Sequence, residues 1–241
     1  MRDGVTDGLQ AVLNFGGVYR TVVARLNHAI DNSGASRVVD LCSGGGGPWP
    51  WLYAHIRSRS NDQIEIVLTD KFPNLAAFKG AFAQTQGRVE FLAESVDANN
   101  PPSELQGFRT LFGSFHHLGP RQARAVLQDA VDQRQGIGIF EVARRHPMAM
   151  LSTVLMPLGA LIITPFIRPF RLPRLFWTYV LPVIPFVLFF DGVISCLRAY
   201  PQKELRALVD QLNAIDYVWE VGEERGSVAP ITYLIGYPSP K

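Results

Sequence analysis

The apolar residues of this chain fall into two regions with different patterns. From residue 36 to residue 142, short apolar runs alternate with longer mixed segments, which is typical of a parallel sheet whose strands are joined by helices. Two more apolar runs close the chain. The strands expected from these runs cover residues 37–41, 63–69, 88–92, 109–114, 136–142, 217–221 and 231–236.

Helices are expected between these strands at residues 50–57, 75–84 and 121–133, and again at 202–212. Residues 1–35 form an expected N-terminal helical cap with a break at Gly16-Gly17, because apolar residues recur there at three- and four-residue steps. The linker at 222–230 is short, so the last two strands are expected to be antiparallel neighbours. The pattern predicts an α/β sandwich.

Composition narrows the class of protein. At 241 residues the chain allows one large domain or one domain with an insertion. Charged residues make up 18% and hydrophobic residues 47%, which excludes disorder and suggests apolar surface beyond an ordinary core. The net charge of +2 is too balanced for nucleic acid as the main partner.

Two cysteines, Cys42 and Cys196, are too few for a disulfide framework or a Cys-rich zinc site, so a reducing compartment is expected and no metal. The N-terminal residues include Asp3 and Asp7, and no apolar run follows them. No secretory signal is therefore expected.

A glycine turn follows the first expected strand in the segment VVDLCSGGGGPW, residues 38–49. Glycines let the backbone approach a ligand, and ligands of open parallel sheets bind at the carboxyl ends of the strands. A dinucleotide fits poorly, because Trp49 stands where its fingerprint needs a third glycine and because Pro48 and Pro50 remove N–H donors. A ligand with ribose, adenine and an amino-acid end but no phosphate suits the turn better.

Residues 40–46 (DLCSGGG) resemble the first motif of class I S-adenosylmethionine-dependent methyltransferases, an acid followed by alternating glycines. The resemblance implies that Asp40, Cys42, Gly44 and Gly46 contact S-adenosylmethionine. Cys42 departs from the pattern, since the family more often has glycine there. It is expected to be a small buried residue beside the cofactor, and a catalytic thiolate is the alternative interpretation.

Three further segments resemble that family. Asp70 ends the second expected strand, where a family acid accepts hydrogen bonds from both ribose hydroxyls, a task that suits a carboxylate. The segment around Asp97 resembles the adenine-contacting segment, and SFHHL, which begins at Ser114, resembles the fourth motif. A helix N-cap remains the alternative role for Asp70, and ordinary loop chemistry the alternative for Asp97.

The resemblance covers residues 36–142 and 200–237 and implies a Rossmann-like class I methyltransferase sandwich. Its mostly parallel seven-stranded sheet would have an antiparallel last strand. The expected catalytic domain covers residues 36–147 and 192–241, with an inserted apolar helical hairpin at 148–191.

His116, His117 and Glu141 are the candidates for acceptor chemistry, because they lie at the carboxyl ends of the fourth and fifth expected strands. A histidine titrates near neutral pH and can remove a proton from a hydroxyl or an amine. The alternatives are that the histidines only pack under the cofactor or cap a helix, and that Glu141 pairs with Arg144 or Arg145.

The inserted segment is strongly apolar. Residues 148–167 carry no charge over 20 positions, and residues 175–190 carry none over 16. As helices these stretches would be roughly 30 Å and 24 Å long, so only the first could cross a hydrocarbon core of about 30 Å. Prolines at 157, 165, 182 and 185 interrupt both stretches.

Arg168, Arg171 and Arg174 lie between the two stretches. A spanning hairpin would carry them across the membrane, which the positive-inside rule disfavours. A hairpin in one leaflet or in the interface would leave them among anionic head groups, each attracted by about 1 kcal/mol, with Trp177 and Tyr179 at a suitable depth. Monotopic attachment to a cytoplasmic membrane face is therefore expected; spanning helices and a soluble apolar lid are the alternatives.

These observations predict a methyltransferase that acts on a hydrophobic small molecule or lipid, because the insertion opens beside the expected cofactor site and can form the wall of an acceptor pocket. Two alternatives stay open. One is a soluble methyltransferase whose apolar segment is a lid, and the other is a non-catalytic, methyltransferase-like membrane interaction module. A nicotinamide oxidoreductase is disfavoured by Trp49 and the two prolines beside it.

Overall fold

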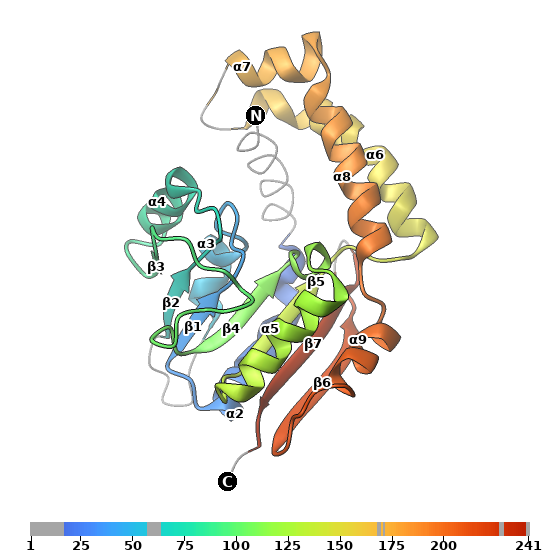
Figure 1. Cartoon of the computed structure of the whole chain (residues 1–241). Helices are drawn as coiled ribbons and strands as arrows, with labels where there is room; N and C mark the ends of the chain where they lie inside the picture. Colours follow the sequence, from blue (N-terminus) through green and yellow to red (C-terminus); the bar gives the residue numbers. More distant parts are fainter. Residues whose placement is uncertain (1–16, 57–63, 168–169, 171, 227–228, 240–241) are drawn as a thin grey trace.

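The computed structural model describes residues 17–56, 64–167, 170, 172–226 and 229–239. These residues form a seven-stranded sheet with the order β3-β2-β1-β4-β5-β7-β6 (Figure 1). The strands are β1 Arg37–Asp40, β2 Glu65–Leu68, β3 Val89–Phe91, β4 Phe108–Phe112, β5 Ile137–Glu141, β6 Tyr217–Glu224 and β7 Ile231–Pro238. Each of the seven expected strands is confirmed, and no strand end differs from its expected position by more than three residues.

The strand directions are those of a mixed sheet. Strands β1 to β5 pair with parallel neighbours, whereas β7 runs antiparallel between β5 and β6. The predicted mostly parallel sheet and the antiparallel closing pair are both confirmed. The residues of β5 are all buried, because helices cover both faces of the sheet.

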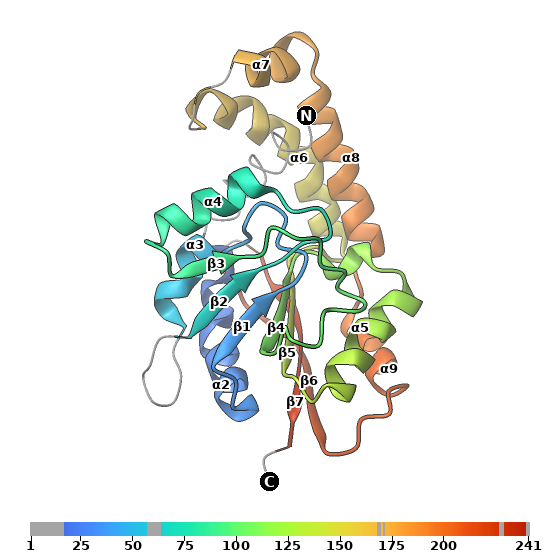
Figure 2. The ribbon, with the colours of Figure 1, turned by 60° about the vertical axis from the view of Figure 1, so that its left-hand side comes forward.

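Helices pack on the two faces in separate groups (Figure 2). On one face, α2 Val23–Ser33, α3 Trp49–Leu52 and α4 Leu75–Gln84 share a core with the short 3₁₀ turn Val18–Val22. On the other, α5 Pro120–Asp132 and α9 Gln202–Val209 cover β4, β5 and β7. The prediction for 75–84 is confirmed residue for residue, while the predicted helix at 50–57 divides into α3 and a 3₁₀ turn, Tyr53–His55.

The expected N-terminal helix lies partly outside the described residues, which begin at Gly17. Gly17 has a φ of 53°, and it precedes the turn that leads into α2. A glycine tolerates this left-handed backbone without strain, which agrees with the predicted break.

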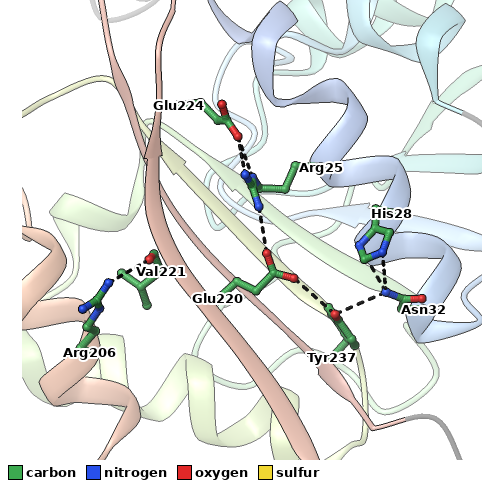
Figure 3. A network of polar contacts seen from close by, with 8 residues as sticks. All are labelled: Arg25, His28, Asn32, Arg206, Glu220, Val221, Glu224 and Tyr237. Carbon is green, nitrogen blue, oxygen red and sulfur yellow. Dashed lines mark hydrogen bonds and ion pairs between the residues drawn. The ribbon is translucent and has the colours of Figure 1, made fainter.

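A polar network attaches α2 to the last two strands (Figure 3). The Arg25 guanidinium donates hydrogen bonds to Glu224 and Glu220, each at 2.9 Å, and lies 4.3 Å from the centre of the Tyr233 ring. The hydroxyl of Tyr237 also donates to Glu220 at 3.3 Å. These contacts hold the N-terminal segment, and with it the turn Val18–Val22, against the sheet.

The inserted hairpin consists of α6 Pro147–Ile163, a 3₁₀ turn Thr164–Phe166, α7 Leu172–Leu175, a π-helical turn Phe176–Val180, and α8 Val183–Arg198. Helices α6 and α8 lie side by side and lead away from the carboxyl edge of the sheet, with α7 at the far end (Figures 1 and 2). Helix α8 continues beyond the expected end of the insertion at residue 191, and Cys196 in this continuation is buried.

Most of the hairpin surface is apolar and exposed. On α6, Leu151, Leu155, Leu158 and Ile162 recur at three- and four-residue steps, and each is more than half exposed. The stretch Pro147–Phe166 is 20 residues long, and an 18-residue window within it has a mean hydropathy of 1.8 with only 12% of that window buried, so the stretch is long and apolar enough to cross a membrane. Residues 172–180 and α8 meet at an angle of 73°, as in a broken span or a re-entrant loop.

The prediction that Arg174 contacts lipid head groups is wrong. Arg174 is 7% exposed, and its guanidinium donates a hydrogen bond to the carbonyl of Ile167 at 2.5 Å. A guanidinium held inside the hairpin tip does not face head groups. Arg168 and Arg171 lie outside the described residues.

Candidate active site at the carboxyl edge of the sheet

The glycine turn after β1 has a left-handed backbone. Cys42, Gly44 and Gly46 have φ angles of 58°, 55° and 102°. The Ser43 hydroxyl donates to the carbonyl of Asp40 at 2.9 Å, which closes the turn. A Cβ built on Gly44 would meet no described atom within 4 Å, so open space adjoins the turn where a ligand could approach. The φ of Cys42 also explains why a glycine would suit that position.

Asp70 joins the end of β2 to this turn. One carboxylate oxygen accepts a hydrogen bond from the backbone N–H of Gly44 at 2.8 Å, and the other accepts from Phe72 N–H at 2.8 Å. The N-cap of α4 is Asn74, which accepts from Ala77 N–H, so the alternative role of Asp70 as the helix cap is wrong. Each carboxylate oxygen has a second lone pair, so Asp70 can still accept from a vicinal diol.

Asp97 lies beside Asp70, since the N–H of Val96 donates to the Asp70 carbonyl at 3.0 Å. The Asp97 carboxylate accepts from Lys71 Nζ at 2.7 Å and from the backbone and side chain of Asn99. The hydrogen bond from Lys71 is the main reason why the pKa of Asp97 is lowered to about 2. Val96 and Ala98, on either side of Asp97 in the sequence, are buried in the core below, so they anchor this segment to the sheet.

Asp40 is the buried residue that ends β1 and supports the glycine turn. It is 1% exposed, and its carboxylate accepts from the Thr110 hydroxyl at 2.7 Å. Burial raises the pKa of Asp40 to about 6, although hydrogen bonds such as the one from Thr110 act in the opposite direction. Asp40 therefore connects the ends of β1 and β4 and does not face open space.

We expect the Asp40→Asn variant to gain stability relative to the wild type as the pH rises. The folded-state pKa of about 6 exceeds the ordinary value of 3.8, so the folded protein holds a proton that the unfolded chain has lost. The ionised carboxylate thus destabilises the wild type progressively between about pH 4 and pH 6. Urea unfolding of both proteins at pH 4 and pH 7 should show a shift of up to about 3 kcal/mol in favour of the variant. A difference that does not change with pH would contradict this account.

The segment after β4 brings two of the acceptor-side candidates together. His116 Nδ1 lies 2.7 Å from one oxygen of Glu141, and the other oxygen accepts from the N–H of Phe115 at 2.6 Å. His116 and Glu141 are both buried. Arg144 and Arg145 pair instead with Glu223 and Glu204, so the alternative pairing of Glu141 with either arginine is wrong.

His117 reaches solvent beside this pair. Its ring centre lies 4.3 Å from that of His116. Desolvation by the surrounding protein lowers the pKa of His117, and the neighbouring His116 adds to the effect. The His117 carbonyl accepts from the Arg198 guanidinium at 2.6 Å, so the base of α8 holds the histidine segment.

Two buried polar atoms of this segment are left without partners. Within the described part of the chain, neither Ser114 Oγ nor His116 Nε2 has a hydrogen-bond partner. An unpaired buried polar atom is rare in a folded protein and calls for an explanation such as a bound ligand. Both atoms follow the carboxyl end of β4, next to Gly113, whose φ is 57°.

Tyr19 lies next to Gly113 at the carboxyl end of β4, although no sequence motif marks Tyr19 as a site residue. Its side chain is 4% exposed, and a Cβ built on Gly113 would lie 3.2 Å from its hydroxyl oxygen. Its pKa is raised by burial and further by the carboxylates of Glu141 and Asp40. The hydroxyl therefore remains a neutral donor between two acids.

Carboxylates dominate the electrostatics of this edge. Burial raises the pKa of the Cys42 thiol to about 12, with Asp70 and Asp40 adding to the shift. A thiol with a raised pKa stays protonated at neutral pH, which disfavours the alternative of a catalytic thiolate at Cys42. The surroundings favour a cationic ligand and oppose the two negative charges of a pyrophosphate.

No protein-family model and no curated protein matches the chain, but solved structures share its fold. An O-methyltransferase family protein from Burkholderia thailandensis aligns with a TM-score of 0.50 at 18% identity over 95% of this chain and 59% of its own. The mitomycin 7-O-methyltransferase MmcR aligns with a TM-score of 0.52 at 13% identity over 95% and 57%. A proposed Zn-dependent alcohol dehydrogenase from Rhodobacter sphaeroides aligns with a TM-score of 0.51 at 11% identity over 98% of both chains.

The chain thus spans less than two thirds of the length of the two methyltransferases. Together with the strand order, the first two similarities identify its fold as the class I methyltransferase fold. The predicted fold class is confirmed.

Proposed function

We propose that the protein is an S-adenosylmethionine-dependent methyltransferase that acts on a hydrophobic small molecule or lipid. The observation that carries the proposal is the hydrogen bond between Asp70 and the N–H of Gly44, which joins an acid to a glycine turn at the carboxyl edge of a methyltransferase fold. The carboxylate-rich surroundings add support, because S-adenosylmethionine carries a positive sulfonium and no phosphate.

The residues of the edge fit this donor. Asp70 would accept from the ribose hydroxyls, the backbone of Gly44 and Gly46 would lie against the donor, and the segment around Asp97 would line the adenine. Ser114 would offer its unpartnered hydroxyl. When bound, the donor supplies a methyl group on a sulfonium that is its own leaving group.

On the acceptor side, the proposal assigns His116 as the general base that takes the proton from the acceptor. Glu141 holds Nδ1, so Nε2 is the nitrogen left to take a proton from an acceptor whose nucleophile carries one, such as a hydroxyl. His117, next to it and more exposed, is the second candidate. The two similar O-methyltransferases support a hydroxyl as the acceptor group.

The hairpin supports a hydrophobic acceptor and a membrane location. Helix α6 carries the exposed apolar stripe and packs beside α8, whose C-terminal end contacts the histidine segment through Arg198. Arg168 and Arg171 follow α6 in the sequence, between the two apolar stretches, an arrangement that suits a hairpin lying in the interface with these charges among head groups. The proposed location is the cytoplasmic face of a membrane.

Isothermal titration calorimetry with S-adenosylmethionine and with NADH tests the cofactor. We expect the first to bind and the second not to bind, whereas the reverse result would favour a nicotinamide oxidoreductase.

Formation of S-adenosylhomocysteine with a lipid extract then tests catalysis, since binding without turnover would indicate a non-catalytic module. Flotation with anionic vesicles tests the membrane location, and a protein that stays at the bottom would favour the soluble lid.

A further inference from the structure

We propose that the Asp191 carboxylate binds a cationic amine group of the acceptor, so that the acceptor is an apolar molecule that also carries a positive charge. The inference deepens the proposed function and rests on it. Asp191 belongs to α8 of the inserted hairpin, which lies outside the segments that resemble methyltransferase motifs.

Asp191 is an isolated charge on an apolar hairpin. It is the one charged residue in the sequence 175–197, and residues 148–167 carry none. Before it on α8, Phe186 and Phe190 are more than half exposed. Within the part of the chain that the structure describes, no hydrogen bond or ion pair joins the Asp191 carboxylate to another residue. An unpaired acid in an apolar, membrane-facing segment is costly, which makes it a candidate group for binding a ligand.

The geometry of α8 turns Asp191 toward the histidine segment. Arg198 lies two helical turns further along α8, so the two side chains share a face of the helix, about 10 Å apart along its axis. The Arg198 guanidinium donates to the carbonyl of His117 at 2.6 Å, which shows that this face looks toward the histidines. Helix α8 also contacts the 3₁₀ turn Phe115–His117 directly.

The electrostatics of His117 agree with this placement. Desolvation is the largest influence on the pKa of His117 and lowers it, whereas the Asp191 carboxylate acts in the opposite direction. The carboxylate and the ring are therefore close enough to interact, although no hydrogen bond joins them. Next to His117, the buried Nε2 of His116 has no partner among the described residues. A molecule that reaches this nitrogen from the hairpin side passes Asp191.

The charges around this point favour a cation. The carboxylate of Glu141 lies behind His116 and acts on His117 with the same sign as Asp191. The guanidinium of Arg198 is engaged by a carbonyl. An anionic group would be repelled by both acids, and a neutral apolar molecule would remove water from Asp191 without compensating its charge. An ammonium group supplies the charge and the N–H donors together, while the apolar body of the molecule can lie along the hairpin.

Calorimetry with decylammonium chloride and with 1-decanol tests the proposal, because these probes share an apolar chain and differ in the charge at its end. We expect Asp191→Asn to bind decylammonium about tenfold more weakly than the wild type, and 1-decanol within about twofold of it. Raising the ionic strength should weaken the wild-type complex with decylammonium toward the affinity of the variant. Asp210→Asn, which removes an exposed acid just after α9, is the matched control and should change neither affinity.

The other results would overturn the inference. If Asp191→Asn binds decylammonium as tightly as the wild type, Asp191 is only a solvated acid. If both probes weaken equally, the side chain shapes the hairpin and does not recognise charge. If the wild type binds S-adenosylmethionine but not decylammonium, the inference is wrong while the proposed function stands. A wild type that does not bind S-adenosylmethionine instead refutes the proposed function, whatever the probes show.

Fractionation of the lipid extract gives a second test that uses turnover. The fraction that a cation exchanger retains should support formation of S-adenosylhomocysteine by the wild type. With this fraction, Asp191→Asn should require about tenfold more extract for half-maximal turnover, and its affinity for S-adenosylmethionine should stay unchanged. Turnover confined to the unretained fraction would show that the acceptor carries no positive charge and would contradict the inference.

Discussion

The Asp70→Ala variant should bind S-adenosylmethionine at least about 100-fold more weakly than the wild type. Two hydrogen bonds from ribose hydroxyls to a carboxylate, each worth about 1.5–3 kcal/mol, would be lost together. The glycine turn would also lose the bond from Gly44 N–H that holds it at 2.8 Å from Asp70. Calorimetric titration of the purified variant measures the effect directly.

Asp97→Ala is the matched control for this change. Asp97 is an acid in the loop that follows the neighbouring strand β3, but its carboxylate is partly exposed and already accepts from Lys71 and Asn99. We expect its removal to weaken binding by about tenfold or less, because an exposed ion pair contributes little. An unchanged affinity in Asp70→Ala, with the variant folded, would rule out the ribose role and the cofactor assignment built on it.

The sheet could be predicted from sequence because its strands obey a simple physical rule. Strands of a parallel sheet are buried on both faces, so runs such as 137–141 are apolar throughout and stand out from the mixed segments around them. Antiparallel pairing of β6 and β7 followed from their short linker. The glycine turn was visible for a similar reason, since only glycine and a few other residues accept the positive φ angles found at Gly44 and Gly46.

Contacts between distant segments could not be predicted in the same way. Glu141 precedes two arginines in the sequence, yet it pairs with His116, 25 residues away, because β4 and β5 are neighbours with aligned carboxyl ends. Tyr19 lies in a helical segment with no motif and reaches the site only through packing on Phe112. Arg174 reads as a surface cation, but its guanidinium is enclosed by the folded tip of the hairpin.

Loss of the His116–Glu141 pair should cause the second large effect, a fall in kcat. We expect His116→Gln and Glu141→Gln each to lower kcat by about 10²- to 10⁴-fold, the usual contribution of a general base. Glutamine at 141 can still accept from the N–H of Phe115, but it cannot stabilise a histidine that has taken up a proton. Affinity for S-adenosylmethionine should stay within about twofold of wild type in both variants, because neither side chain is assigned to the donor. Rates of S-adenosylhomocysteine formation with a saturating donor and the same lipid extract measure the loss of kcat in each variant.

His117→Gln decides between the two adjacent histidines. His117 reaches solvent and lies 4.3 Å from His116 between ring centres, but no carboxylate orients it at hydrogen-bond distance among the described residues. Its replacement should therefore lower kcat by less than about tenfold, since a base without an orienting partner contributes less than an oriented one. If His117→Gln abolished turnover while His116→Gln retained it, the buried pair would be structural and the exposed ring would be the base. In that case Glu141 would act on kcat only by holding the histidine segment in place, since its carboxylate also accepts from the backbone N–H of Phe115. The activity lost in Glu141→Gln would then not return when the pH is raised.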